Sequence, residues 1–375
     1  MNVELNQEEL LKALSHGQSV VEKKTTVPIL SYVLLNAQAG TLTLTSTDLD
    51  ISLVETIPAH VIQEGMLTVS AHMLFEVVKK LTPSRPVVLN FDQEQGWMFI
   101  QSGKASFKLP TLSVEDYPKL TQTPLPYDLT LFVESLKRLI EKTRFCMAVD
   151  ETRYLLTGIY LHPIEKDGKL FLRAVATDTH RLACVDILNE SISLEMPGII
   201  IGKKTINEIY KLLNDVDAKS GIHLSFSTQR LELSNESFTF TSRLIEGKYP
   251  SYERAIPQGN DRPMIVPTQD FMDAVERVAI LTTNDKVRAL KLSASNDLVT
   301  LSALSQDNAS GQDELSVSYE SEAFETGFNA RYLQEFFQQL DNDETQLLFG
   351  DPQQPVIIQH LNDPCLQFIL MPIKV

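Results

Sequence analysis

Apolar residues recur at helical spacing in three segments spread along the 375-residue chain. Segments 70–81, 202–213 and 329–340 each place apolar side chains at positions i, i+3, i+4 and i+7, the spacing of an amphipathic helix. In order, these side chains are Leu74, Val77, Val78 and Leu81, then Ile206, Ile209, Tyr210 and Leu213, then Leu333, Phe336, Phe337 and Leu340. The pattern predicts three helices of one type.

A second helix type repeats with the same rhythm at 7–24, 133–144 and 270–283. Its inward positions are Leu10, Ala13, Leu14 and Gly17, then Leu136, Leu139, Ile140 and Thr143, then Phe271, Ala274, Val275 and Val278. One such match would be unremarkable, because amphipathic helices are common. Two helix types that share one period indicate an internal repeat.

Strand patterns repeat between the helices. Segment 41–55 alternates apolar and polar residues on either side of a polar "TSTD" break, which predicts a strand, a turn and a second strand. Segment 170–187 is the counterpart, with Thr177-Asp178 in place of Thr47-Asp48, and 298–319 is a third copy with a longer connection. "LSVEDYP" at 112–118 and "LIEGKYP" at 244–250 form a further pair.

These patterns predict an α+β protein of three similar domains, each with two helices packed on antiparallel sheets. Proline-containing connectors at 121–129 and 255–267 lie where the copies should join. We therefore expect domains at 1–124, 125–255 and 256–375. A unit that is repeated with so little retained identity suggests selection on shape more than on a single reactive centre.

Charge is distributed unevenly along the chain. The formal net charge is −16, which argues against a nucleic-acid partner unless positive charge is concentrated somewhere. The predicted helices supply such a concentration, although the third copy is not basic: Lys79, Lys80, Lys137, Arg138, Lys142, Arg144, Lys203, Lys204 and Lys211. These helices could hold a polyanion, or their charges could simply be solvated.

Composition indicates a globular protein, with 43% hydrophobic and 22% charged residues. The three cysteines, Cys146, Cys184 and Cys365, are scattered without CxxC spacing, which predicts a reducing compartment and no zinc or other metal site. No signal peptide or long apolar run is visible. We expect a cytoplasmic protein without a cofactor.

The segment "ATDTHRLACV" at 176–185 looks catalytic, because it gathers Asp178, His180 and Cys184. An enzyme using these three is the main alternative in another functional class, but GxSxG, HExxH, P-loop and GxGxxG motifs are absent from the sequence. The Thr-Asp pair also recurs at 47–48 without a histidine or cysteine. The repeat thus explains the pair, and we expect no catalytic residues.

Several stretches, in order and spanning nearly the whole chain, resemble the bacterial DNA polymerase III β subunit, the DNA sliding clamp. They are "VPIL" (27–30), "TSTDLD" (45–50), "RYLLTG" (153–158), "VATDTHRLA" (175–183), "SRLIEGKYPSYERAIP" (242–257), "ETGFNARYL" (325–333) and "FILMPIKV" (368–375). The resemblance implies a head-to-tail homodimer of six domains that closes as a ring around duplex DNA, with the helices lining the hole. It implies a non-catalytic processivity factor that binds the replicative polymerase, the clamp loader, other polymerases and repair proteins through short peptides. A triplicated protein-binding scaffold that never encircles DNA is the remaining alternative.

The resemblance also assigns residues to three sites. A hydrophobic peptide-binding pocket would include Leu156, Thr177, Thr179, His180, Arg181, Leu182, Pro250, Arg254, Ala255, Asn329, Tyr332, Met371, Pro372 and Ile373. Besides the helix lysines and arginines, the DNA contacts would map to Lys24, His72, Asp150, Tyr154 and Leu155. The dimer interface would use Phe107, Ile280 and Leu281. Thr179 stands where the family often has glycine, and His72, Asp150 and Leu155 depart from the family's residues at their positions.

Overall fold

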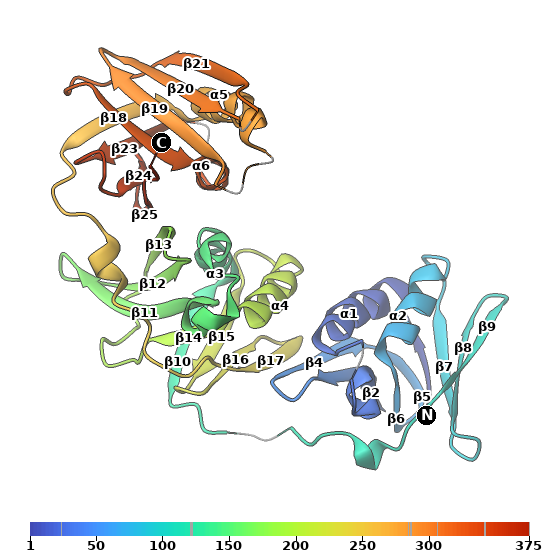
Figure 1. The fold of residues 1–375 in the computed structure, drawn as a ribbon. Coiled ribbons are helices and arrows are strands. Elements are labelled where there is room, and N and C mark those ends of the chain that lie inside the picture. The colour runs from blue at the N-terminus through green and yellow to red at the C-terminus, as the bar shows by residue number, and fades with distance from the viewer. Residues whose placement is uncertain are drawn as a thin grey trace. The chain divides into compact units, whose positions relative to one another are not determined.

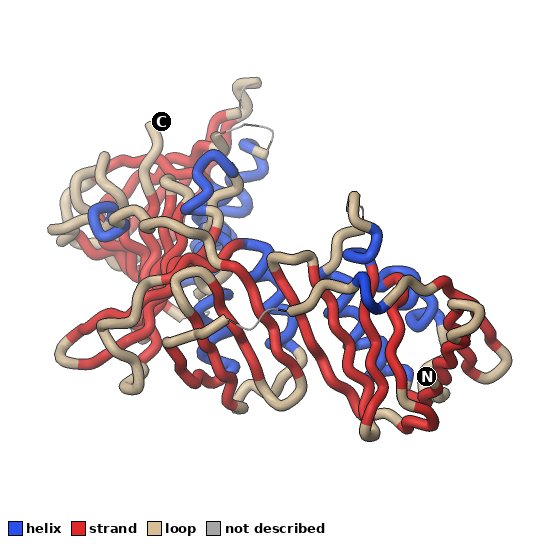
Figure 2. Tube along the Cα trace, turned by 90° about the horizontal axis from the view of Figure 1, so that it is seen from below, coloured by secondary structure: helices blue, strands red, loops and turns tan. Residues whose placement is uncertain are grey.

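The computed structural model describes residues 1–23, 25–120, 123–283, 285, 287–305, 307–340 and 343–374. The chain divides into two compact units, one made of residues 1–134 and 204–244 and the other of residues 135–203 and 245–375. Each unit combines antiparallel sheets with helices (Figures 1 and 2), which confirms the predicted α+β class.

The first unit contains two sheets. The five-stranded sheet has the order β5 (His60–Gln63), β1 (Asn2–Leu5), β7 (Val87–Asp92), β8 (Trp97–Ser102) and β9 (Ala105–Pro110). The eight-stranded sheet has the order β10 (Tyr127–Phe132), β15 (Gly221–Phe226), β16 (Arg230–Ser234), β17 (Phe238–Arg243), β4 (Ile51–Pro58), β3 (Thr41–Thr47), β2 (Tyr32–Gln38) and β6 (Gly65–Ser70).

The second unit also contains two sheets. Its eight-stranded sheet has the order β14 (Ile199–Gly202), β11 (Gly158–Lys166), β12 (Lys169–Thr177), β13 (Arg181–Leu188), β25 (Asp363–Leu370), β24 (Val356–His360), β23 (Glu344–Phe349) and β18 (Arg262–Pro267). The four-stranded sheet has the order β21 (Ser310–Ser316), β20 (Leu298–Leu304), β19 (Ala289–Ser295) and β22 (Phe324–Asn329).

All six predicted helices are present: α1 (Gln7–Val20), α2 (Ala71–Lys80), α3 (Val133–Glu141), α4 (Lys203–Asn214), α5 (Thr268–Ala279) and α6 (Ala330–Phe337). Of the 24 inward positions named above, all are buried except Val77 and Tyr210, which are half-buried. Ser70 and Asn329 act as N-caps, because their side chains accept hydrogen bonds from backbone N–H groups of the first turn.

The predicted helix ends were partly wrong. Helix α1 stops four residues short of the predicted 24, because Val21 is already extended, with ψ at 151°. Helix α6 stops at Phe337 instead of Leu340, and α5 gives way after Ala279 to the 3₁₀ turn η6 (Ile280–Thr282). Apolar spacing continues past each of these points, so it could not show where the regular helix ends.

One strand order is repeated three times. The half-sheets β6-β2-β3-β4, β14-β11-β12-β13 and β22-β19-β20-β21 each place their fourth strand in sequence beside the first, as in a Greek key. The half-sheets β10-β15-β16-β17 and β18-β23-β24-β25 run in simple order, as do β1, β7, β8 and β9. Each repeat therefore contributes one half-sheet of each kind.

Two strand pairs join the repeats. Strand β4 pairs with β17 over Ile51–Glu55, and β13 pairs with β25 over Arg181–Val185. The strands in the matching positions of the remaining half-sheets, β9 and β21, are sheet edges with no outer partner among the described residues. We call the β4–β17 pair and its surroundings the first joint, and the β13–β25 pair and its surroundings the second joint. Strands β9 and β21 correspond to the two sides of a third joint of the same kind, but neither is paired on its outer side in the part of the chain that the structure describes.

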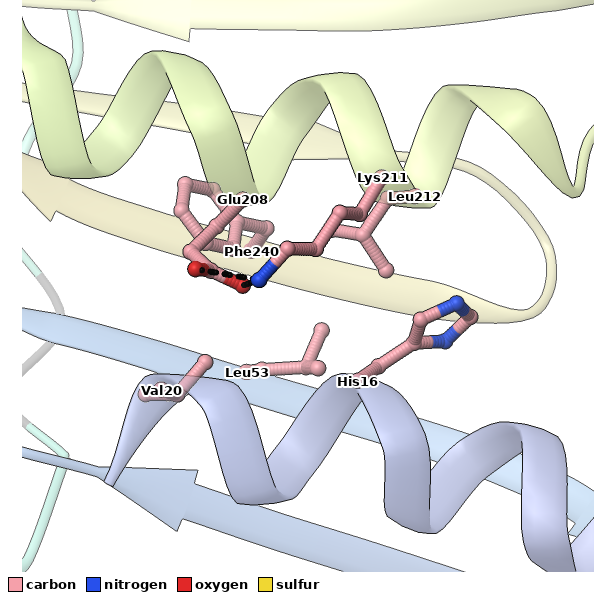
Figure 3. Close-up of a pocket in the computed structure, with 7 residues that line it drawn as sticks. All are labelled: His16, Val20, Leu53, Glu208, Lys211, Leu212 and Phe240. Carbon is pink, nitrogen blue, oxygen red and sulfur yellow. Dashed lines mark hydrogen bonds and ion pairs between the residues drawn. The ribbon is translucent and has the colours of Figure 1, made fainter. Parts of the chain in front are cut away.

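The first joint is filled by side chains from α1, α4, β4 and β17 (Figure 3). Val20, Leu53, Leu212 and Phe240 surround a small space that leaves no room for a water-sized molecule. Beside them, buried His16 contacts two carboxylates: its Nδ1 is 3.1 Å from Oε2 of Glu55, and its Nε2 is 2.8 Å from Oδ2 of Asp215. This region is a packed joint and does not accommodate a ligand.

Candidate functional site

The turn between β12 and β13 is built from its own side chains. The Thr177 hydroxyl donates to the Arg181 carbonyl at 2.7 Å and accepts from the Thr179 N–H at 3.1 Å. Asp178 Oδ1 accepts from the N–H groups of His180 (3.0 Å) and Arg181 (3.1 Å). The threonine and aspartate are therefore occupied in shaping the turn.

The turn between β3 and β4 repeats this network. The Thr47 hydroxyl donates to the Ile51 carbonyl at 2.8 Å and accepts from the Leu49 N–H at 3.0 Å. Asp48 Oδ1 accepts from the N–H groups of Asp50 (3.0 Å) and Ile51 (2.7 Å). The shared Thr-Asp pair is thus a structural element of the repeat, as the sequence indicated.

Arg181 differs from its counterpart Ile51 and organises the second joint. Its side chain is 6% exposed, and it donates to the Phe145 carbonyl at 2.6 Å and to Asp178 at 3.1 Å. It also forms an ion pair with Glu335 on α6, and its guanidinium lies 4.3 Å from the ring centre of Tyr332. Arg181 is therefore enclosed by fixed partners and supports the surface from beneath.

Residues from three distant segments meet above Arg181. The His180 ring stacks on Tyr332 at 6.4 Å, and the His180 carbonyl accepts from the Met371 N–H at 3.0 Å. The tail continues through Pro372 to Ile373, whose N–H donates to the Gly327 carbonyl at 2.8 Å. The structure thus brings together the predicted pocket residues of the turn, of α6 and of the C-terminal tail.

An apolar floor lies beside this group. Leu156 and Leu182 are buried in one cluster with Tyr249, Tyr252 and Ile369, and Ala255 packs against it. Pro250 and Arg254, on the segment that carries Ala255, are exposed. An open cleft of about 510 Å³ adjoins the group and is lined by His180, Arg181, Tyr332, Arg144, Arg153 and Lys203, among others.

The side chains of two predicted pocket residues form hydrogen bonds within the protein. Asn329 caps α6 by accepting from the N–H groups of Arg331 and Tyr332. The Thr179 hydroxyl accepts a hydrogen bond from Arg153 at 2.6 Å. Arg153, Arg144 and Glu335 line the cleft but were not assigned to a pocket from the sequence; the only signal for Arg153 was its place at the start of the "RYLLTG" stretch.

The five individually predicted DNA contacts differ in their surroundings. Tyr154 is 56% exposed, whereas Leu155 packs against the apolar floor. Asp150 caps the 3₁₀ helix η4 (Glu151–Leu156), and hydrogen bonds from Thr152 lower the pKa of its carboxyl. Burial, together with nearby Lys23, lowers the pKa of half-buried His72. Lys24 lies outside the described residues.

Several predicted DNA-binding cations have partners within the chain. Arg138 forms an ion pair with Asp363, Lys142 donates to the Gln339 carbonyl, and Lys204 pairs with Asp48. Lys79 lies 5.3 Å from the Phe75 ring centre. Lys80 and Lys203 are exposed, and Lys137 is half-buried. The positive charge of the helices is thus partly compensated by neighbouring acids.

The geometry disfavours catalysis by Asp178, His180 and Cys184. Asp178 is engaged in the turn, and Cys184 points into the buried cluster, where burial raises the pKa of its thiol to about 12. A thiol of this kind is not ionised at neutral pH and is a poor nucleophile. In the described part of the chain, no group of three or more histidine, cysteine, aspartate or glutamate side chains could hold a metal ion. Across the same residues, no helix is long and apolar enough to span a bilayer.

Family models match three successive parts of the chain. They describe the N-terminal domain of the DNA polymerase III beta subunit at residues 1–121, its central domain at 130–251 and its C-terminal domain at 253–374. The chain belongs to the DNA polymerase III β-subunit family. Three domains of this family thus follow the three strand repeats of the fold.

Full-length relatives agree with this membership. The beta sliding clamp of Caulobacter vibrioides is 36% identical over 375 residues, and that of Pseudomonas aeruginosa is 32% identical; each match covers 100% of both chains. A crystal structure of the sliding clamp from Bartonella birtlesii, bound to griselimycin, is 38% identical with a TM-score of 0.95, covering 100% of both chains.

Within this family fold, one of the predicted interface residues lies on an edge strand and the other two lie in a 3₁₀ turn next to another edge strand. Phe107 is 38% exposed on edge strand β9. Ile280 is 72% exposed in η6, and Leu281 packs close to Gly311 of edge strand β21. Neither Phe107 nor Ile280 belongs to the buried core.

Proposed function

We propose that the chain acts as a non-catalytic sliding clamp, in which two copies associate head to tail and encircle duplex DNA. The observation that carries this proposal is the pair of unpaired edges. Two joints of the β4–β17 kind already exist within the chain, and β9 and β21 are the two halves of another. A second copy supplies each missing half, which gives a closed assembly of six domains.

The side chains of the two edges support this pairing. Strand β9 presents Phe107 and Lys108, with Lys108 Nζ 4.2 Å from the Trp97 ring centre. Strand β21 presents exposed Glu314, and Leu281 lies beside it; Asp313 on the same strand is already paired with Arg277 of α5. Apolar contact combined with opposite charge favours β9 of one copy against β21 of the other.

The helices that carry Lys79, Lys80, Lys137 and Lys203 would attract the phosphates of the encircled DNA. Because a ring is retained by its topology, weak and sequence-independent attraction is sufficient and still permits sliding. The rest of this acidic chain repels DNA. This division reconciles a net charge of −16 with a nucleic-acid partner.

The group formed by His180, Tyr332, Met371 and the apolar floor is proposed as the pocket for partner peptides. A pocket of leucine, proline and methionine edged by a few polar groups suits a short apolar anchor. The proposed partners are the replicative polymerase, the clamp loader, other polymerases and repair proteins, in the cytoplasm. A relative from Bartonella birtlesii binds griselimycin, which serves as a probe for this chain.

Native mass and DNA loading test the ring together. The chain should have the mass of a dimer, and an active clamp loader should place it on nicked circular DNA, from which it escapes when the circle is linearised. Gel filtration of the loaded circles measures retention. A protein that is never retained on circles, with a loader that loads a control clamp, would instead be a scaffold that does not encircle DNA.

Griselimycin binding tests the pocket. Tyr332→Ala should weaken binding about tenfold or more in isothermal titration calorimetry, because it removes an aromatic wall and the partner of His180. His60→Ala, at an exposed position on β5, is the control and should bind as the parent protein does. Equal binding by both variants would exclude Tyr332 from the pocket.

A further inference from the structure

The segment 249–255 carries three of the proposed pocket residues, Pro250, Arg254 and Ala255, and contains the single 3₁₀ turn η5 (Tyr252–Ala255). Two aromatic rings fasten the segment to the sheet. The Tyr249 ring stacks on Tyr160 of β11, with centres 4.8 Å apart and planes 5° apart. Tyr252 is 4% exposed and lies in the same buried cluster. The position of this pocket wall therefore depends on what holds the two rings.

Tyr252 is part of a directed chain of hydrogen bonds. His162 Nδ1 is 3.1 Å from the Pro163 carbonyl, which can only accept, so the proton of the neutral ring resides on Nδ1. His162 Nε2 is then an acceptor, and the Tyr252 hydroxyl 3.0 Å away donates to it. Arg173 Nη1 donates to the Tyr252 oxygen at 3.4 Å. Both functions of the hydroxyl are thus satisfied.

The side chain of Arg173, at the other end of this series of hydrogen bonds, is itself held in place. Arg173 Nε donates to Asp186 Oδ1 at 2.6 Å, and Nη2 donates to Oδ2 at 2.8 Å. Arg173 and Asp186 are directly opposite each other on β12 and β13, and Asp186 is 2% exposed. A bidentate ion pair between residues on paired strands leaves the guanidinium little rotational freedom. The hydroxyl of Tyr252 is therefore held at a defined point on the sheet.

We propose that Tyr252, held between Arg173 and His162, is a positioning residue that sets the pocket wall at residues 250–255 for peptide binding. The proposal rests on the proposed function of the pocket. Tyr252 contacts no peptide in this role: it is buried beneath the wall, and it acts through Ala255, which packs on the same cluster as Leu156 and Leu182. A small rotation of η5 would move Pro250 and Arg254 relative to this floor.

This series of hydrogen bonds also makes the pocket sensitive to pH, because Nε2 of protonated His162 cannot accept a hydrogen bond from the Tyr252 hydroxyl. Burial is the main influence that lowers the pKa of His162, and the charge of Arg173 on β12 lowers it further. The Pro163 carbonyl, Glu253 on η5 and Asp186 on β13 act in the opposite direction, and the net pKa is lowered from its ordinary value of 6.5. The accepting form is thus complete above pH 6.5 and is lost as the pH falls through the lowered pKa.

Griselimycin binding by hydroxyl-deletion variants is the first test. Tyr252→Phe should weaken binding by about three- to tenfold, the effect of losing a buried hydrogen-bonding group, and should leave the dimer mass unchanged. Tyr160→Phe is the matched control, because it removes a hydroxyl from the same aromatic stack that makes no hydrogen bond among the described residues. Equal affinities of Tyr252→Phe and the parent protein would overturn the proposal.

Variants of His162, measured from pH 5 to pH 8, separate positioning from general loss of structure. His162→Gln keeps an acceptor near the Tyr252 hydroxyl without a titrating ring, so it should keep the affinity at pH 7.5 and lose part of the decline at low pH. His162→Leu should resemble Tyr252→Phe at all pH values. Only the part of the pH dependence that both Tyr252→Phe and His162→Gln remove is assigned to His162. A pH profile that neither variant alters would overturn the proposal.

The pocket assignment and the positioning role of Tyr252 would be contradicted by different results. A parent protein that does not bind griselimycin would reject the pocket assignment itself. A parent protein that binds, while Tyr252→Phe and His162→Leu bind equally well, would reject only the positioning role. If Tyr252→Phe proves too unstable to measure, the comparison of His162→Gln with His162→Leu still decides, since both keep the tyrosine in place.

Discussion

Leu49 and Thr179 hold the same rare backbone conformation in two different repeats. Their φ angles are 83° and 78°, a region that side chains with a Cβ atom occupy at a cost. The surrounding turn enforces it, because the Asp48 and Asp178 carboxylates each accept hydrogen bonds from the N–H groups two and three residues later. Thr179 therefore adopts this conformation at an energetic cost, in a turn with the same hydrogen bonds as the turn at Leu49.

Replacing Leu49 with glycine should stabilise the protein. Leu49 is 57% exposed, so little packing is lost, and glycine tolerates the positive φ; we expect a gain of about 1 kcal/mol in the free energy of unfolding. Urea denaturation measures it. Thr179→Gly is the comparison and should gain less, because it also removes the acceptor for Arg153. Destabilisation by Leu49→Gly would show that the turn is not strained.

At this scale the sequence predicts the kinds of residues in the site better than their partners. It indicated that Arg138 belongs to a basic helix, but the acid that neutralises it, Asp363, lies 225 positions away. Likewise, the joining of His180 to Tyr332 and Met371 depends on the β13–β25 pairing, which the helical and strand periods do not reveal. Contacts between remote segments are set by tertiary packing, which a local sequence pattern does not predict.

At the scale of elements, the two joints within the chain use related positions. Glu208 on α4 pairs with Lys211, and Glu335, which stands 127 positions later on α6, pairs with Arg181 and Arg331. The first joint differs in containing His16, whose two ring nitrogens both face carboxylates. Both nitrogens donate only when the ring is protonated, so the joint favours the charged form.

The His16 contacts predict a pH-dependent joint. Burial opposes the charge on His16, but hydrogen bonds and the negative charges of Glu55 and Asp215 outweigh it, and the pKa is raised above 6.5. The resulting stabilisation is therefore complete below pH 6.5 and is lost as the pH rises through the raised pKa. His16→Gln should lower the free energy of unfolding by about 2 kcal/mol at pH 6 and by less at pH 9.

Urea denaturation at the two pH values measures this difference. His60→Gln, at an exposed position, is the control and should show no such dependence. A loss on His16→Gln that is equal at pH 6 and pH 9 would mean that the charge of the ring does not contribute to the joint.

The elements themselves were largely predictable. Hydrophobic periodicity predicted all six helices and the strand-turn-strand units at 41–55, 170–187 and 298–319, because each element buries one face. The periodicity did not predict the short 3₁₀ turns η4, which Asp150 caps, and η5, which has no side-chain cap and is held by the tertiary contacts of Tyr252. It also did not show which half-sheets join, since any strand with an apolar face could pair with another.

At the scale of the whole molecule, the dimer should depend on few apolar side chains. The double change Ile280→Ala and Leu281→Ala should yield monomers, because it removes the exposed apolar surface beside β21. Multi-angle light scattering at low micromolar concentration measures the mass. Val287→Ala, at another exposed position, serves as the control. An unchanged dimer mass in the double variant would contradict the proposed interface.

The opposite charges on β9 and β21 bear on pairings between two like edges as well as on the proposed pairing of β9 with β21. If two copies met through like edges, one pairing would bring together two β9 strands that each carry exposed Lys108, and the other would bring together two β21 strands that each carry exposed Glu314. Like charges on neighbouring strands repel, so both symmetric pairings are disfavoured relative to the mixed pairing. In the proposed ring, Lys108 on one edge and Glu314 on the other therefore favour one direction for every copy, and with it one polarity of the ring.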